Sequence, residues 1–175
     1  MKRPDQISLE AVLDEPLAFA CELSLSVASL DREPLLDIFP VRVDGSVSRV
    51  EGGYSLAAHV VWGGTLECSR CLAPYPFQED EKFSLLYYKR KPPQGAEVLL
   101  APDDLDIHYY QEPVISLSSI AEERIQMAVP MKPLCREDCR GLCPRCGGDL
   151  NLEPCGCAVA QVDPRWEALR SLKKV

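Results

Sequence analysis

In this 175-residue chain, the residues whose type and spacing are suited to chemistry such as metal binding are pairs of cysteines. The four close pairs are Cys68-x2-Cys71, Cys135-x3-Cys139, Cys143-x2-Cys146 and Cys155-x-Cys157. A Cys-x2-Cys turn can wrap around one Zn²⁺, with each thiolate as a ligand at about 2.3 Å. In CPRCGG, Pro144 presets the turn and the glycines 147–148 permit positive φ, so that amide groups can turn toward the sulfurs. The four pairs supply ligands for two closed four-cysteine sites.

Two pairing schemes follow from the spacing. The segment between Cys146 and Cys155, GGDLNLEP, can form a short hairpin that brings CPRC and CGC onto one metal. CSRC would then share a second metal with CREDC, which ties the late segment back to residue 68. A single local site made by CREDC and CPRC is the alternative.

Other cysteine chemistry fits this pattern less well. A thioredoxin-type enzyme expects its CxxC motif near a βαβ pattern, and the spacings match neither common ferredoxin run. Catalytic zinc sites keep an open position and often use histidine, but we expect surface or core roles for His59 and His108, the two histidines of the chain. Cys21 stands alone and reads as a small buried hydrophobe. We therefore predict one or two structural Zn²⁺ ions.

The N-terminal stretch and the hydropathy indicate a cytoplasmic protein without a membrane partner. Acidic residues interrupt any signal-peptide core near the N-terminus. No apolar run approaches the roughly 20 residues that are needed to span a bilayer. In a reducing compartment, paired cysteines indicate metal or redox chemistry rather than structural disulfides.

The alternation of apolar residues predicts an α+β fold that is mainly antiparallel β, arranged as a meander or a partly closed barrel. The predicted strands cover residues 17–29, 41–50, 54–70, 74–90 and 112–116. Glu51-Gly52-Gly53 is typical of a hairpin turn. A helix is predicted over 117–131, and a second helix opens at Asp163-Pro164.

These elements predict two domains. Residues 1–131 would form a β-rich domain that ends in a helix. Residues 132–175 would form a cysteine-rich zinc-knuckle module with a C-terminal helix. Cys68 and Cys71, at the end of the third predicted strand, would staple the module to the first domain.

The charge of the chain is uneven and bears on its partners. Residues 1–131 carry 11 basic and 21 acidic groups, whereas residues 132–175 carry 8 and 6, which gives a total of −8. Such a chain is a poor general binder of nucleic acid, since affinity for phosphate depends on Lys and Arg. The candidates for a local contact with RNA or a partner are Lys89, Arg90, Lys91, Arg136, Arg140 and Arg145. The alternative is that these charges only solvate the surface.

No catalytic motif accompanies the cysteines. The chain has no Gly-rich phosphate loop, nucleophile elbow or HExxH motif. Its acidic runs are typical of solvated faces, and no pair of carboxylates is placed by the sequence as acid and base. We therefore expect no enzymatic activity and no small-molecule substrate.

The combination of an early CSRC after a β-rich half, CREDCRGLCPRCGGDLN, CGC and DPRWEALRSLKK resembles the YceD family, the large ribosomal RNA subunit accumulation proteins. The resemblance spans nearly the whole chain and is most specific from Cys135 to Leu172. It implies a non-catalytic role in 23S ribosomal RNA accumulation and large-subunit assembly, with the precursor large subunit, through its RNA or a ribosomal protein, as partner. Cysteine sets vary within this family, so zinc would support the fold of this member. A zinc-bound thiol redox switch and a protein-only zinc-knuckle adaptor, for example in transcription, are the alternatives.

Overall fold

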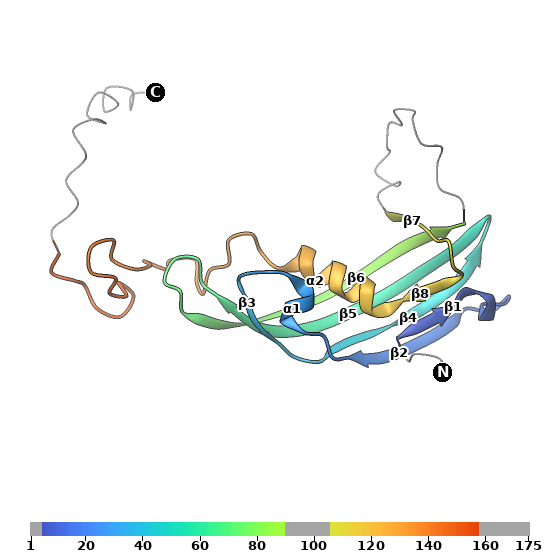
Figure 1. Cartoon of the computed structure of the whole chain (residues 1–175), viewed down its shortest axis with the longest axis horizontal. Coiled ribbons are helices and arrows are strands. Elements are labelled where there is room, and N and C mark those ends of the chain that lie inside the picture. Colours follow the sequence, from blue (N-terminus) through green and yellow to red (C-terminus); the bar gives the residue numbers. More distant parts are fainter. Residues whose placement is uncertain (1–4, 90–105, 158–175) are drawn as a thin grey trace, which may run out of the picture.

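The computed structural model describes residues 5–89 and 106–157, and one long, twisted sheet dominates them (Figure 1). Its strands are β2 (Leu17–Leu23), β3 (Leu35–Ile38), β4 (Val41–Val50), β5 (Gly53–Glu67), β6 (Pro74–Tyr88) and β7 (Ile107–Tyr109). The order is β2-β4-β5-β6-β7, and β3 also pairs with β5. All of these pairings are antiparallel except β6 with β7. A small second sheet pairs β1 (Gln6–Ser8) with β8 (Val114–Ser116).

The consecutive strands β4, β5 and β6 form the predicted meander, and the α+β class is confirmed. Gly52, with φ of 77°, makes the tight β4–β5 turn. The β5–β6 hairpin is paired along fifteen residues of each strand, from Gly53 opposite Tyr88 to Glu67 opposite Pro74. Within residues 5–89 and 106–157, the outer strands β2 and β7 do not pair with each other. The sheet is therefore open, and the partly closed barrel is not formed.

One face of the sheet is covered by two helices, α1 (Val27–Leu30) and α2 (Leu117–Ala128), which lie on the same side in Figure 1. A 3-10 helix, Leu9–Ala11, follows β1. Alternate residues of β5, such as Leu56 and Val60, are buried on the covered face and pack in one core with Ile125 of α2. None of the described helices is long and apolar enough to cross a membrane.

Polar contacts fix α2 on the sheet. Ser116 caps the helix, because its side chain accepts a hydrogen bond from the Ser119 amide at 3.3 Å. Nη1 of Arg124 lies 3.4 Å from a carboxylate oxygen of Glu81 in β6. The same guanidinium lies 4.3 Å from the ring centre of Phe83, a cation–π arrangement.

The structure differs from the sequence-based prediction in short elements. The strand predicted over 17–29 ends at Leu23, because the Ser26 side chain accepts from the Ser29 amide and caps α1. Strands β1, β3 and β7 were not predicted, since three or four residues are too few to show alternation. The helix predicted from Asp163 lies outside the described residues.

Truncating the buried face of β5 tests which side of the sheet carries the core. Leu56 is fully buried, so Leu56→Ala should lower the free energy of unfolding by about 2–5 kcal/mol. Val61 lies on the same strand but on the uncovered face, and Val61→Ala should cost about 1 kcal/mol or less. Urea denaturation of the two variants measures the difference. Equal losses would contradict the one-sided core.

Candidate metal centres

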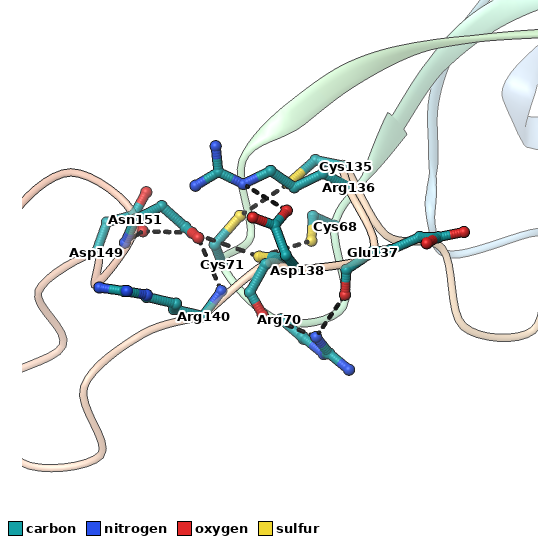
Figure 2. A network of polar contacts seen from close by, with 11 residues as sticks. Cys68, Arg70, Cys71, Cys135, Arg136, Glu137, Asp138, Arg140, Asp149 and Asn151 are labelled. Carbon is teal, nitrogen blue, oxygen red and sulfur yellow. Dashed lines mark hydrogen bonds and ion pairs between the residues drawn. The ribbon is translucent and has the colours of Figure 1, made fainter.

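The first cysteine centre joins the β5–β6 turn to the segment after α2. It consists of Cys68, Cys71, Cys135 and Cys139, whose sulfurs all lie within 4.8 Å of one another. The turn is closed by two backbone hydrogen bonds, from the Cys68 amide to the Ala73 carbonyl at 3.0 Å and from the Leu72 amide to the Cys68 carbonyl at 2.9 Å. A third bond, from the Ser69 amide to the Pro133 carbonyl at 2.9 Å, ties the later segment to the turn. Figure 2 shows the two segments meeting at the sulfurs.

Distances between these sulfurs match a tetrahedral metal site. Cys68 Sγ lies 3.8 Å from Cys139 Sγ, and Cys71 Sγ lies 3.7 Å from Cys135 Sγ. Four sulfurs at about 2.3 Å from one Zn²⁺ would be about 3.8 Å apart in a regular tetrahedron. A disulfide would instead require an S–S distance of about 2.05 Å. The donor set therefore fits a metal ion.

The backbone around the first centre favours a thiolate at one cysteine and a proton at another. Burial raises the pKa of Cys68, but amide donors from Cys135, Cys71 and Arg70 outweigh it and lower that pKa to about 6. Burial raises the pKa of Cys135 to about 12, together with the hydrogen bonds and charges of the neighbouring cysteines. The contrast arises because one negative charge among these sulfurs opposes a second.

Arg70 braces the first centre from the turn. Its guanidinium donates to the Cys139 carbonyl at 2.8 Å and to the Glu137 carbonyl at 3.2 Å. Its own carbonyl accepts from the Leu142 amide at 3.1 Å. Gly141 passes close to this carbonyl with φ of 73°, and a Cβ at Gly141 would lie 2.9 Å from it. A side chain is therefore excluded at Gly141 by both conformation and space.

The second cysteine centre lies farther along the chain, in the segment that extends beyond the sheet in Figure 1. It consists of Cys143, Cys146, Cys155 and Cys157, again with all sulfurs within 4.8 Å of one another. The Cys143 amide donates to the Gly148 carbonyl at 2.8 Å, and the Gly147 amide donates to the Cys143 carbonyl at 2.9 Å. Gly147 has φ of 71°, which closes this turn. The sequence CPRCGG thus forms the turn that its residues predict, and its two sulfurs lie where they could hold a metal ion.

The same separation of pKa values appears in the second centre. Amide donors from Cys146 and Arg145 lower the pKa of Cys143 to about 6, and the Arg145 amide lies 3.4 Å from its sulfur. Hydrogen bonds with Cys146 and Cys143, followed by burial and their charges, raise the pKa of Cys157 to about 12. In each centre the first cysteine along the chain, Cys68 or Cys143, therefore favours the thiolate form, which can attract a cation.

The structure groups the cysteines as the two-centre scheme does. CSRC lies with CREDC, and CPRC lies with CGC, whereas the single local site would need CREDC beside CPRC. Both four-cysteine groups could hold a metal ion. Cys21 lies apart from them in β2, where burial and then the charge of Asp5 raise its pKa.

The basic candidates fall at different ends of the structure. Arg136, Arg140 and Arg145 are all exposed on the cysteine-rich segment, and Arg136 lies 3.5 Å from Asp138. Lys89 is exposed after the end of β6, at the end of the sheet away from the cysteine centres (Figure 1). Arg90 and Lys91 lie outside the described residues.

The histidines lie in the sheet. His59 in β5 is hydrogen-bonded to Asp80 at 2.7 Å and lies 3.6 Å from Asp44. His108 in β7 stacks on Tyr87, with 5.4 Å between the ring centres. Neither histidine belongs to the cysteine centres.

Asn151 is a site residue that the sequence reasoning missed. Its side-chain amide donates to Cys139 Sγ at 3.4 Å, and its carbonyl oxygen accepts from the Arg140 amide at 2.8 Å. Asp149 holds it in place, because one carboxylate oxygen accepts from both amides of Asn151. The available signal was that Asn151 is the single asparagine of the chain and stands between the last two cysteine pairs.

Comparisons with known proteins point to one family. The sequence profile of the YceD family, described as large ribosomal RNA subunit accumulation protein, matches residues 56–173. An uncharacterized protein of Mycobacterium tuberculosis is 30% identical over 147 residues, which cover 84% of this chain and 66% of the relative. The uncharacterized protein YlbN of Bacillus subtilis is 29% identical over 140 residues, 78% of this chain and 76% of the relative.

A plant relative carries a functional name. The chloroplastic large ribosomal RNA subunit accumulation protein YCED homolog 1 of Zea mays is 26% identical over 169 residues, which cover 83% of this chain and 58% of the relative. The match to the Mycobacterium tuberculosis relative likewise covers slightly less than two thirds of that protein's length. No solved structure matches the chain significantly.

Metal content tests the two centres separately. We expect about two zinc equivalents in the purified protein and about one in Cys71→Ser or Cys143→Ser, because each substitution removes a ligand from a different centre. Elemental analysis by mass spectrometry measures the ratio of zinc to protein. Cys21→Ser is the matched control and should keep both equivalents. A full metal content in Cys143→Ser would contradict its assignment as a ligand.

Metal affinity should also depend on pH. In the metal-free protein, the thiols of Cys135 and Cys157, whose pKa is about 12, hold their protons near neutral pH. Metal binding displaces at least one proton per centre, so affinity should rise with pH by about tenfold or more per unit. Calorimetric titration in buffers of different ionisation enthalpy counts the released protons. No proton release would show that the binding thiols were already ionised.

Proposed function

The chain belongs to the YceD family, the large ribosomal RNA subunit accumulation proteins, and from this premise we propose that it is a non-catalytic assembly factor for the large ribosomal subunit. In this role it supports accumulation of 23S ribosomal RNA. Its two cysteine centres hold structural zinc. The match of the family profile to residues 56–173 carries the proposal, because this range includes the β5–β6 hairpin and both centres.

Zinc is the metal that suits these centres best. Four thiolates around one ion form a closed site, with no position left for a water or a substrate. Cys68 and Cys139 of the first centre are almost fully buried. A tetrahedral set of four sulfurs also suits iron. The closed ligand sets support a structural role for the metal and leave the binding of partners to the surrounding surface.

The metal centres hold a surface in a fixed position. Residues 144–148 and 152–154 are exposed, so the second centre is surrounded by solvent-facing backbone and side chains. The first centre anchors this segment to the end of the β5–β6 hairpin. A rigid segment loses little conformational entropy on binding, which is the advantage of such a module for recognition.

Charge favours a protein component of the precursor particle as the first contact. Residues 132–157 carry four basic and four acidic side chains, and each zinc with four thiolates adds about −2. Residues 5–31 contain six acidic residues and no Lys or Arg. Such a surface attracts basic ribosomal proteins rather than phosphate. Arg136, Arg140 and Arg145 then act at short range, once the protein is docked.

Sedimentation tests the proposed function. A tagged chain from a gently lysed native host should migrate with free large subunits or their precursors in a sucrose gradient. Ribonuclease treatment should release it, because the particle itself is destroyed. A protein that stays at the top of the gradient would oppose the assembly role and favour the adaptor or the redox switch.

A matched pair of variants links this association to the metal centres. Cys71→Ser removes a ligand of the first centre and should abolish co-migration, since the module loses its anchor on the sheet. Cys21→Ser changes a cysteine outside both centres and should sediment like the natural chain. Equal association of both variants would separate the assembly role from the first metal centre.

A further inference from the structure

The two cysteine centres are joined by a very short bridge. Only Arg140, Gly141 and Leu142 separate Cys139, the last ligand of the first centre, from Cys143, the first ligand of the second. Such a bridge transmits displacement, because three residues leave little slack between two fixed ends.

Each residue of the bridge is anchored by a backbone hydrogen bond. The Arg140 amide donates to the Asn151 side chain at 2.8 Å. The Gly141 carbonyl accepts from the Leu150 amide at 2.9 Å, and the Leu142 amide donates to the Arg70 carbonyl at 3.1 Å. The bridge is thus held on one side by the β5–β6 turn and on the other by residues 150–151.

Asn151 links the segment that the second centre closes to a ligand of the first centre. It belongs to the segment between Cys146 and Cys155, which is closed by the second centre and by a β-bridge between Leu142 and Asp149. Its side-chain amide nevertheless donates to Cys139 Sγ of the first centre, at 3.4 Å. One side chain is therefore held by Asp149 within the segment that the second centre closes, and it donates a hydrogen bond to the first centre.

We propose that Asn151 is a positioning residue that couples metal binding at the two centres. This inference rests on the metal-binding part of the proposed function. When the second centre is loaded, the segment from Cys146 to Cys155 is closed and holds the Asn151 amide against Cys139. The N–H group then stabilises the negative charge of the metal-bound thiolate, as partners of metal ligands commonly do. When the second centre is empty, the segment opens and the first centre loses this donor.

Coupling between two sites is reciprocal in free energy. A metal in the first centre fixes Cys139 and hence the bridge that begins at Arg140. The bridge in turn places Cys143, the buried ligand of the second centre. Loss of either metal should therefore weaken the other centre by the same factor.

The test measures the affinity of each centre with the other centre intact or disabled, by competition of the full chain with a zinc chelator. Cys157→Ser disables the second centre and should lower the zinc affinity of the first by about tenfold. Cys135→Ser should lower the affinity of the second centre by the same factor. Affinities that do not change in either variant would overturn the coupling, whereas a chain without zinc would overturn the metal-binding part of the proposed function.

Asn151 itself is tested in two variants of similar size. Asn151→Leu removes the donor and the acceptor, and Asn151→Asp keeps an acceptor for the Arg140 amide but cannot donate to sulfur. Both should lower the zinc affinity of the first centre by about tenfold and remove its dependence on the second centre. Gln111→Leu, an exposed amide outside the cysteine-rich segment, is the matched control and should leave both values unchanged.

A spectroscopic readout separates positioning from a general loss of structure. In the cobalt-substituted protein, loss of the hydrogen bond should shift thiolate-to-cobalt charge-transfer absorption to longer wavelength, because the sulfur electrons are then less stabilised. An unshifted spectrum, or natural affinity and coupling in Asn151→Asp, would overturn the role of this hydrogen bond.

Discussion

In each centre four cysteine sulfurs lie within 4.8 Å of one another. As thiolates they would repel one another, and a cation between them would reverse this repulsion. Two unit charges at about 3.8 Å repel by about 4 kcal/mol at an effective dielectric constant of about 20. In the first centre this repulsion would act between two distant segments of the chain, because its four cysteines come from the β5–β6 turn and from the segment after α2. The same charges that would drive the two segments apart hold them together once a metal is bound.

The long hairpin explains where this centre lies. Fifteen paired residues in each of β5 and β6 carry the CSRC turn to one end of the sheet, and the chain that follows α2 runs toward the same end (Figure 1). The register of the β5–β6 pairing fixes the position of the turn. A slip by one residue would move the core residues of β5 to the uncovered face. The hydrophobic core thus aligns a hairpin whose tip supplies two ligands.

Local features could be predicted from the sequence, whereas contacts between distant residues could not. The alternation in residues 41–50 and 74–88 is long enough to reveal strands, and CPRCGG reveals its turn by composition. The grouping of Cys68 with Cys139 depends on the path of α2, so spacing alone left the single-site scheme open. Asn151 has no pattern at all, because one amide beside one sulfur follows only from the folded geometry.

The hydrophobic core of the sheet and the first cysteine centre meet at one side chain, Tyr75. Of residues 132–157, Cys139 and Cys143 belong to the buried hydrophobic residues, whereas no Leu, Ile, Val or aromatic residue of this segment does. Bound metal would supply the order that a core supplies elsewhere, as in small modules that are too short for a core. Tyr75 in β6 packs against both the sheet core and the first centre. Burial, followed by the negative charge that Cys68 and Cys135 carry when they are ionised, raises its pKa. The neutral phenol thus lets an apolar core end directly against a charged metal site.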